Sequence, residues 1–73
     1  MKQISIDQFL TPAEIRKAAA LYKKLKGGGK FAETLDAEII TPNIERINKA
    51  LGQENDSRFL AYAVEYVFMQ SGG

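Results

Sequence analysis

The C-terminal stretch Asp56–Gln70 constrains the fold most, because it is apolar around most of a helix. Its large apolar residues form two neighbouring helical stripes: Phe59, Tyr62, Tyr66 and Met69 on one, and Leu60, Val64 and Val67 on the next. Arg58 and Glu65 mark a polar side, and Phe68 lies close to it. A helix of this kind is normally surrounded by other elements or buried against a second chain. The sequence therefore predicts that this helix packs centrally in the fold.

The chain length limits the fold to one small domain. Its 73 residues leave room for a single domain, residues 1–73, near the lower end of what folds unaided. A core of this size rarely supplies more than about 3–5 kcal/mol of net stability. Contact with a second chain would add to that stability, so we expect a homodimer or a complex with another protein.

Missing residue types exclude most catalytic chemistry. The sequence has no cysteine and no histidine, so a thiolate nucleophile is impossible and a zinc site would rest on carboxylates alone. We therefore predict no enzymatic activity, no cofactor, no metal and no small-molecule substrate. The chain has neither an 18-residue apolar run nor a signal-peptide pattern over residues 1–10. These features favour a cytoplasmic protein that does not enter a membrane.

The N-terminal residues 1–10 fit two local structures. Ile4 and Ile6 alternate with polar residues as in a strand, but no second strand is readable. Ser5 followed three residues later by Gln8 instead fits a capping box. We favour a short arm or helical turn whose apolar residues pack on the rest of the domain.

The first long helix has a clear start. Thr11 suits the N-cap, Pro12 the first helical position, and Glu14 the third position of a capping box. An apolar stripe follows with helical spacing: Ile15, Ala18, Ala19, Tyr22 and Leu25. We expect the triple glycine, residues 27–29, to end this helix.

Two further helices are predicted before the C-terminal one. Residues 30–40 carry an apolar face with helical spacing. The pair Thr41-Pro42 repeats the cap-and-proline signal, so we expect a new helix at Pro42 rather than one bent helix. Gly52 suits the C′ position of this helix, and Asn55 or Asp56 caps the last one. The prediction is an all-α fold, a small bundle of about four helices, with residues 71–73 as a flexible tail.

The C-terminal helix also supplies the candidate protein interface. The other helices cannot cover its whole circumference, so some of its large side chains stay exposed. Aromatic residues and methionine are enriched at protein interfaces. The candidate interface residues are Tyr62, Tyr66, Phe68 and Met69. We expect a small adaptor, regulator or inhibitor that contacts a protein partner, with self-association through this helix.

A basic segment provides the alternative function. Residues 16–30 contain six cations and no acid: Arg16, Lys17, Lys23, Lys24, Lys26 and Lys30. Such a run can neutralise several phosphates, which makes a nucleic-acid-binding regulator the competing hypothesis. A helix-turn-helix variant would use Asn43, Arg46 and Lys49 for contacts. The plainer interpretation is a solvated helix end whose lysines complement the helix dipole.

Two weaker patterns do not indicate a site. The triple glycine before Lys30 lacks the flanking residues of a phosphate-binding Walker loop, since Lys24 and Phe31 occupy the required positions. Glu33 and Asp36 share a helix face, but no second base or pocket-forming segment accompanies them. We interpret both as ordinary exposed features.

Overall fold

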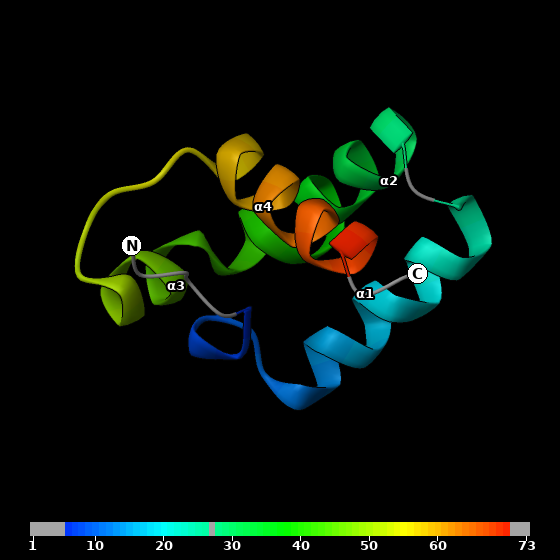
Figure 1. Ribbon diagram of the computed structural model, residues 1–73. Helices are drawn as coiled ribbons and strands as arrows, with labels where there is room; N and C mark the ends of the chain where they lie inside the picture. The colour runs from blue at the N-terminus through cyan, green and yellow to red at the C-terminus, as the bar shows by residue number, and fades with distance from the viewer. Residues whose placement is uncertain (1–5, 27, 71–73) are drawn as a thin grey trace.

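The computed structural model describes residues 6–26 and 28–70, and this part of the chain is helical without any strand (Figure 1). Its elements in order are η1 (Ile6–Gln8), α1 (Pro12–Leu25), α2 (Gly28–Leu35), η2 (Asp36–Ile40), η3 (Thr41–Asn43), α3 (Ile44–Leu51) and α4 (Ser57–Gln70). The predicted all-α class is confirmed. The finer expectation of a four-helix bundle is not confirmed. The predicted tail at 71–73 and the Ser5 cap lie outside the described residues.

Helix α1 begins as its sequence predicts. The Glu14 amide donates to the Thr11 hydroxyl at 3.2 Å, and the Thr11 amide donates to the Glu14 carboxylate at 2.9 Å. This reciprocal capping box, with Pro12 in the first turn, satisfies two amides that lack partners inside the helix.

Helix α1 ends next to the triple glycine, as predicted, but a lysine rather than a glycine makes the C-cap. The helix stops at Leu25, and Lys26 takes the left-handed conformation with φ of 56°. Its amide donates to the Tyr22 carbonyl at 2.6 Å. Because Lys26 makes the reversal, Gly28 and Gly29 fall in the first turn of α2 instead of in a loop.

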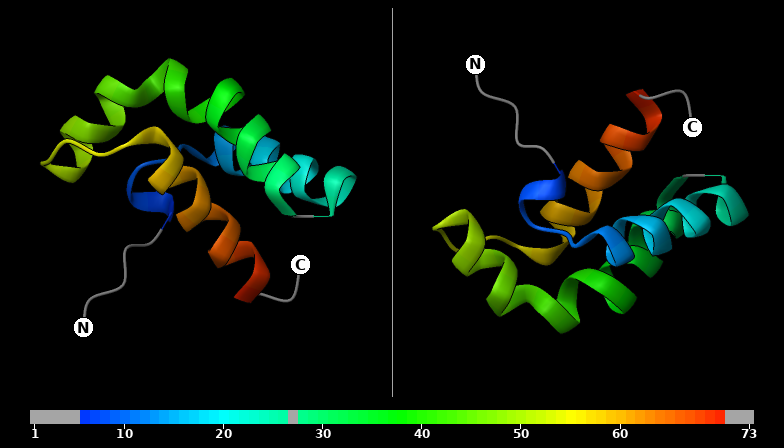
Figure 2. Two further views of the ribbon diagram at one scale, coloured as in Figure 1. Left: turned by 90° about the horizontal axis from the view of Figure 1, so that it is seen from above. Right: turned by 90° about the horizontal axis from the view of Figure 1, so that it is seen from below.

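The segment from α2 to α3 is one arched helical path (Figure 2), which contradicts the predicted new helix at Pro42. Thr41 is itself helical, and its hydroxyl bonds the Asp36 carboxylate at 2.6 Å instead of capping a new helix. The Thr41 amide reaches back five residues to the Asp36 carbonyl in the π-helical η2. This wider turn, followed by the 3-10 turn η3, fits Pro42 into the path with a bend rather than a break.

The junction between α3 and α4 follows its predicted signals. Gly52 has φ of 75° and donates its amide to the Asn48 carbonyl at 2.8 Å, which ends α3. The Asp56 carboxylate accepts from the Arg58 amide at 2.8 Å. Asp56, rather than Asn55, therefore caps α4, since Asn55 bonds to the Asn48 side chain and the Gln53 carbonyl.

The buried core lies mainly along α2 and η2. These two elements contribute Phe31, Ala32, Leu35, Ile39 and Ile40. Helix α4 adds only Leu60, Ala61 and Val64, and packs mainly against α2 and η2. The turn at η1 leads into the buried Phe9 and Leu10, as expected for residues packed on the domain. Helix α4 is thus covered on one face, and some of its large side chains stay exposed, as the sequence predicts.

Candidate protein interface on helix α4

Four large apolar side chains of α4 are exposed to solvent. The exposed fractions are 60% for Phe59, 56% for Tyr62, 60% for Tyr66 and 59% for Met69. Their spacing of three, four and three residues places them on one helix face, over about 15 Å of helix length. We call these four residues the α4 stripe. The opposite face of the helix carries the buried Leu60 and Val64.

The α4 stripe is comparable in area to the largest apolar patch of a typical monomer. An aromatic side chain offers about 150–250 Å². With more than half of each side chain exposed, the stripe presents on the order of 450 Å² of largely apolar surface. The largest apolar patch on a typical monomer covers about 300–600 Å² and is often functional. The stripe is therefore the leading candidate for a binding surface.

Phe68 occupies a different environment from the other predicted interface residues. It is partly buried, and its ring stacks on Tyr22 with centroids 5.5 Å apart and an interplanar angle of 22°. It also meets the ring of Phe31 edge-on at 6.1 Å, and Tyr22 meets Phe31 edge-on at 5.1 Å. Phe68 thus belongs to an aromatic cluster that joins α1, α2 and α4, not to the stripe.

Phe59 was missed as a candidate residue. The structure places it on the same face as Tyr62, Tyr66 and Met69, with the largest exposed fraction of the four together with Tyr66. The sequence signal was present, because residues 59, 62, 66 and 69 have the a/d spacing of a heptad. Extending the candidate set along that spacing would have found it.

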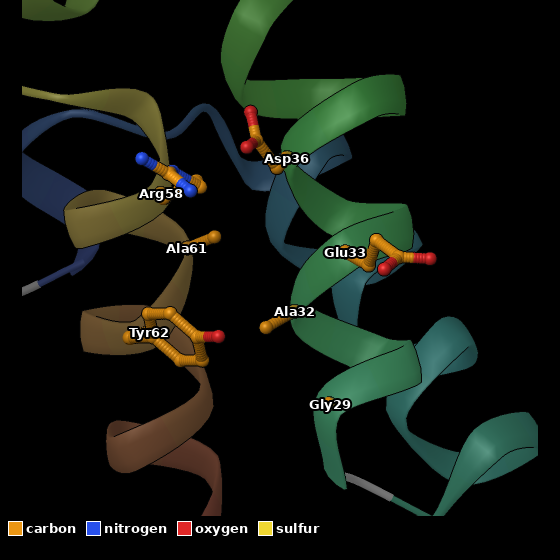
Figure 3. A pocket seen from close by; sticks show the side chains of 7 residues that line it. All are labelled: Gly29, Ala32, Glu33, Asp36, Arg58, Ala61 and Tyr62. Carbon is orange, nitrogen blue, oxygen red and sulfur yellow. The ribbon is translucent and has the colours of Figure 1, made fainter.

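A shallow groove runs beside the stripe, between α2 and α4 (Figure 3). Seven residues line its volume of 280 Å³: Gly29, Ala32, Glu33, Asp36, Arg58, Ala61 and Tyr62. The methyl groups of Ala32 and Ala61 face each other, and the Tyr62 hydroxyl points toward α2. Tyr62 belongs to both the groove and the stripe, so the two surfaces are continuous.

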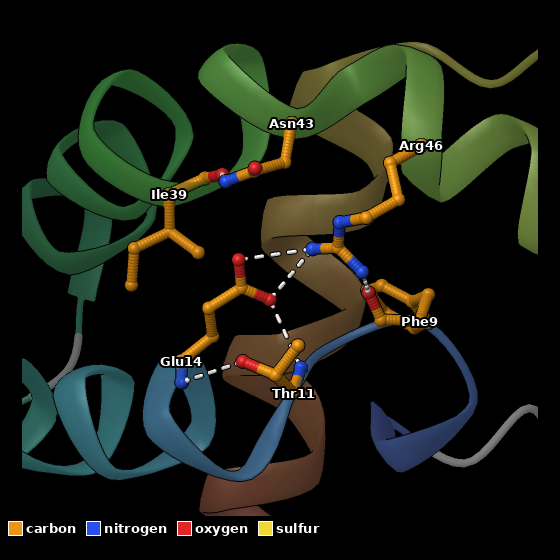
Figure 4. A network of polar contacts seen from close by, with 6 residues as sticks. All are labelled: Phe9, Thr11, Glu14, Ile39, Asn43 and Arg46. Atoms are coloured by element: carbon orange, nitrogen blue, oxygen red, sulfur yellow. Dashed lines mark hydrogen bonds and ion pairs between the residues drawn. The ribbon is translucent and has the colours of Figure 1, made fainter.

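A polar network holds α3 against the start of α1 (Figure 4). One guanidinium nitrogen of Arg46 contacts both Glu14 carboxylate oxygens, at 2.7 and 2.9 Å, and the other donates to the Phe9 carbonyl at 3.3 Å. The Asn43 side chain donates to the Ile39 carbonyl at 2.8 Å. Two residues of the helix-turn-helix hypothesis, Asn43 and Arg46, therefore make hydrogen bonds within the chain, although the Arg46 side chain is 43% exposed.

The basic residues predicted to bind an anionic partner are all exposed. On α1, Arg16 and Lys23 are seven residues apart, as are Lys17 and Lys24, so the four cations share one side of the helix. Lys26 and Lys30 follow at the turn into α2. The ion pairs found over residues 6–26 and 28–70 join Arg46 to Glu14 and Arg58 to Asp56, and neither involves this basic surface.

The described part of the chain holds no cluster of three or more acidic side chains suited to a metal ion. Within it, no helix has the length and apolar character needed to cross a membrane. Comparison with protein-family models, curated proteins and solved structures finds no match to this chain.

Proposed function

We propose that this protein is a non-enzymatic interaction module that associates with a second copy of itself through the α4 stripe. One observation carries the proposal: Phe59, Tyr62, Tyr66 and Met69 are each more than half exposed on a single helix face. Exposed apolar patches of this extent favour protein contact over contact with water.

The size of the stripe supports a second copy as the partner. A standard interface buries about 800 Å² on each partner. The stripe supplies roughly half of that area, and the adjoining α2–α4 groove extends it. A two-fold dimer uses the same patch on both chains, so this one surface is sufficient for both sides of the contact.

Sedimentation equilibrium over a wide concentration range tests the proposal. We expect the weight-average mass to rise from 8.1 kDa toward twice that value. Tyr66→Glu would return the chain to a monomer, because association would bury the new carboxylate without a partner. Circular dichroism would show an unchanged helix content, since Tyr66 is exposed in the monomer.

The control variant is Ala20→Glu, which adds the same charge to an exposed position on α1. We expect it to leave the dimer intact. A wild-type chain that stays monomeric at all concentrations would contradict the proposal. Loss of the dimer in Ala20→Glu but not in Tyr66→Glu would move the contact to α1.

A second candidate function is nucleic-acid binding by the basic surface of α1. Its supporting observation is that Arg16, Lys17, Lys23 and Lys24 share one exposed side that carries no acid. Four phosphate contacts predict a slope of about 3–4 for log Kd against log salt with duplex DNA. The double variant Lys23→Glu/Lys24→Glu should abolish binding, whereas Lys49→Glu/Arg58→Glu, with the same change of net charge, should weaken it much less. Failure of duplex DNA and RNA to bind at low salt would eliminate this candidate.

A further inference from the structure

We infer that two copies of α4 pair in antiparallel orientation about a two-fold axis that crosses the helix at the level of Val64. Tyr62 of each chain then lies over Tyr66 of the second copy, and Phe59 lies over Met69 of the second copy. This arrangement rests on the proposed self-association and adds to it the orientation and the residue pairs.

The spacing of the stripe permits this pairing. The intervals between Phe59, Tyr62, Tyr66 and Met69 are three, four and three residues, which read the same in both directions. The midpoint of the stripe is Val64, so an antiparallel copy places every stripe residue opposite another one. Side chains at these a/d positions interdigitate when two helices pack at a small angle.

The residue pairs also fit by chemistry. The antiparallel pairing places two pairs of tyrosines at the centre, where their rings can stack with an offset and their hydroxyls can reach the solvent at the rim. At each end it sets the Met69 thioether against the ring of Phe59, a contact between sulfur and an aromatic ring that is favourable. A parallel pairing would set Phe59 on Phe59 and Met69 on Met69, and would lose both sulfur contacts.

Charge at the helix ends favours the same orientation. Helix α4 has no basic residue in its last turn, so its partially negative C-terminal carbonyls have no compensating cation there. At the other end, the Arg58 side chain is 78% exposed and makes a long ion pair with Asp56 at 3.9 Å. An antiparallel partner brings Arg58 beside those C-terminal carbonyls. A parallel partner brings the two Arg58 side chains together at the positive helix ends.

Glu65 lies next to the proposed axis, but it does not oppose the pairing directly. One of its carboxylate oxygens is buried within its own chain in the monomer. That oxygen is therefore covered before any second copy binds.

Disulfide trapping tests the orientation cleanly, because the natural chain has no cysteine. The variants are Phe59→Cys and Met69→Cys, both at exposed positions. In the antiparallel dimer, two copies of Phe59→Cys would hold their cysteines about 15 Å apart along the helix, because ten residues separate them. A disulfide needs Cα atoms within about 7 Å. Neither variant should therefore cross-link to itself, whereas an equimolar mixture should give a covalent dimer on oxidation.

Each outcome of the cross-linking experiment supports or contradicts the antiparallel pairing. A covalent dimer formed only by the mixture supports the antiparallel pair. A covalent dimer of Phe59→Cys alone establishes a parallel pair and overturns this inference, while the proposed self-association stands. If nothing cross-links, sedimentation of the wild-type chain separates the two failures. A dimer then places the contact elsewhere and overturns the inference, and a strict monomer overturns the proposed function as well.

Discussion

Helices α2 and α4 both carry large apolar side chains, yet they differ in how completely the fold covers these side chains. Phe31 and Leu35 on α2 are fully buried, whereas Phe59 and Tyr66 on α4 are each 60% exposed. Helix α2 contacts α1, α4 and η2, and α4 contacts α1, α2 and η2, but the buried residues of α4 all lie on one face. An apolar pattern thus indicates that a helix face tends to be buried, and the topology of the chain determines whether that face is buried within the same chain.

The largest expected effect comes from removing a buried side chain of α2. Phe31→Ala removes a ring that is completely buried and in edge contact with Tyr22 and Phe68. Substitutions of this kind cost about 3–5 kcal/mol. That equals the net stability expected of a core this small, about 3–5 kcal/mol, so we predict a largely unfolded chain at 25 °C. Circular dichroism during urea titration measures it, and an unchanged midpoint would show that Phe31 does not anchor the core.

A sharper test compares two phenylalanines on the same helix. Phe68 lies on the inner side of α4 in the aromatic cluster, and Phe59 lies on the outer stripe. We predict that Phe68→Ala lowers the free energy of unfolding by about 2–3 kcal/mol, less than the about 3–5 kcal/mol of a fully buried phenylalanine, because Phe68 is only partly buried. Phe59→Ala should change it by less than about 0.5 kcal/mol, as for other surface positions.

Phe59→Ala should affect dimer formation strongly although it hardly affects folding of the monomer. At low protein concentration the chain is monomeric, and the denaturation curves of Phe68→Ala and Phe59→Ala should differ as stated. At high concentration, Phe59→Ala should weaken association about tenfold or more, as expected for an aromatic anchor. Equal destabilisation of the monomer by both variants would mean that the inner and outer faces of α4 are not distinct.

The sequence predicted well those features that depend on neighbouring residues. The capping box at Thr11 and the left-handed glycine at Gly52 require only contacts within one or two turns, and both are present. The prediction failed at Thr41-Pro42, because the same cap-and-proline signal is overridden by the Thr41–Asp36 hydrogen bond and the π turn. That outcome depends on how η2 packs in the core, and the local sequence pattern carries no information about this packing.

The candidate site was predictable only in part for the same reason. Helical spacing placed Tyr62, Tyr66 and Met69 on one face. The spacing could not show which part of the circumference of α4 would be covered by α1 and α2. Helical spacing alone therefore predicts Phe68 as an interface residue although it stacks on Tyr22, and it does not single out Phe59 although Phe59 is exposed.

Gly52 and Gly29 lie at helix ends. Substituting them tests how strongly backbone conformation at those ends affects the free energy of unfolding. Gly52→Ala places a side chain at φ of 75°, and we predict a loss of about 1–2 kcal/mol in the free energy of unfolding. Gly29→Ala lies in α2, where an added methyl group would meet nothing within 4 Å. Alanine there should stabilise the protein by about 0.5–1 kcal/mol. Thermal melts of both variants should move in opposite directions, and a shift of the same sign would contradict the backbone argument.

The smallest expected effect concerns the charge on the outer face of α4. Arg58→Glu replaces a cation near the N-terminus of the helix with an acid, which suits that end of the dipole by about 0.3–1 kcal/mol. The monomer should therefore be as stable as the wild type or slightly more stable.

The antiparallel dimer should respond in the opposite direction. There the new carboxylate would lie beside the C-terminal carbonyls of the second copy, so we predict a dissociation constant that rises about twofold to fivefold. Lys49→Glu on α3 makes the same change of net charge elsewhere, and it should leave association unchanged. Opposite signs for folding and association are the distinctive expectation. In a parallel pair the two new carboxylates would repel each other as the two arginines do, but each would lie beside the partially positive N-terminus of the second copy, so the pair would bind more tightly. A tighter Arg58→Glu dimer at low salt would therefore argue against the antiparallel arrangement, even if the stripe remains the contact surface.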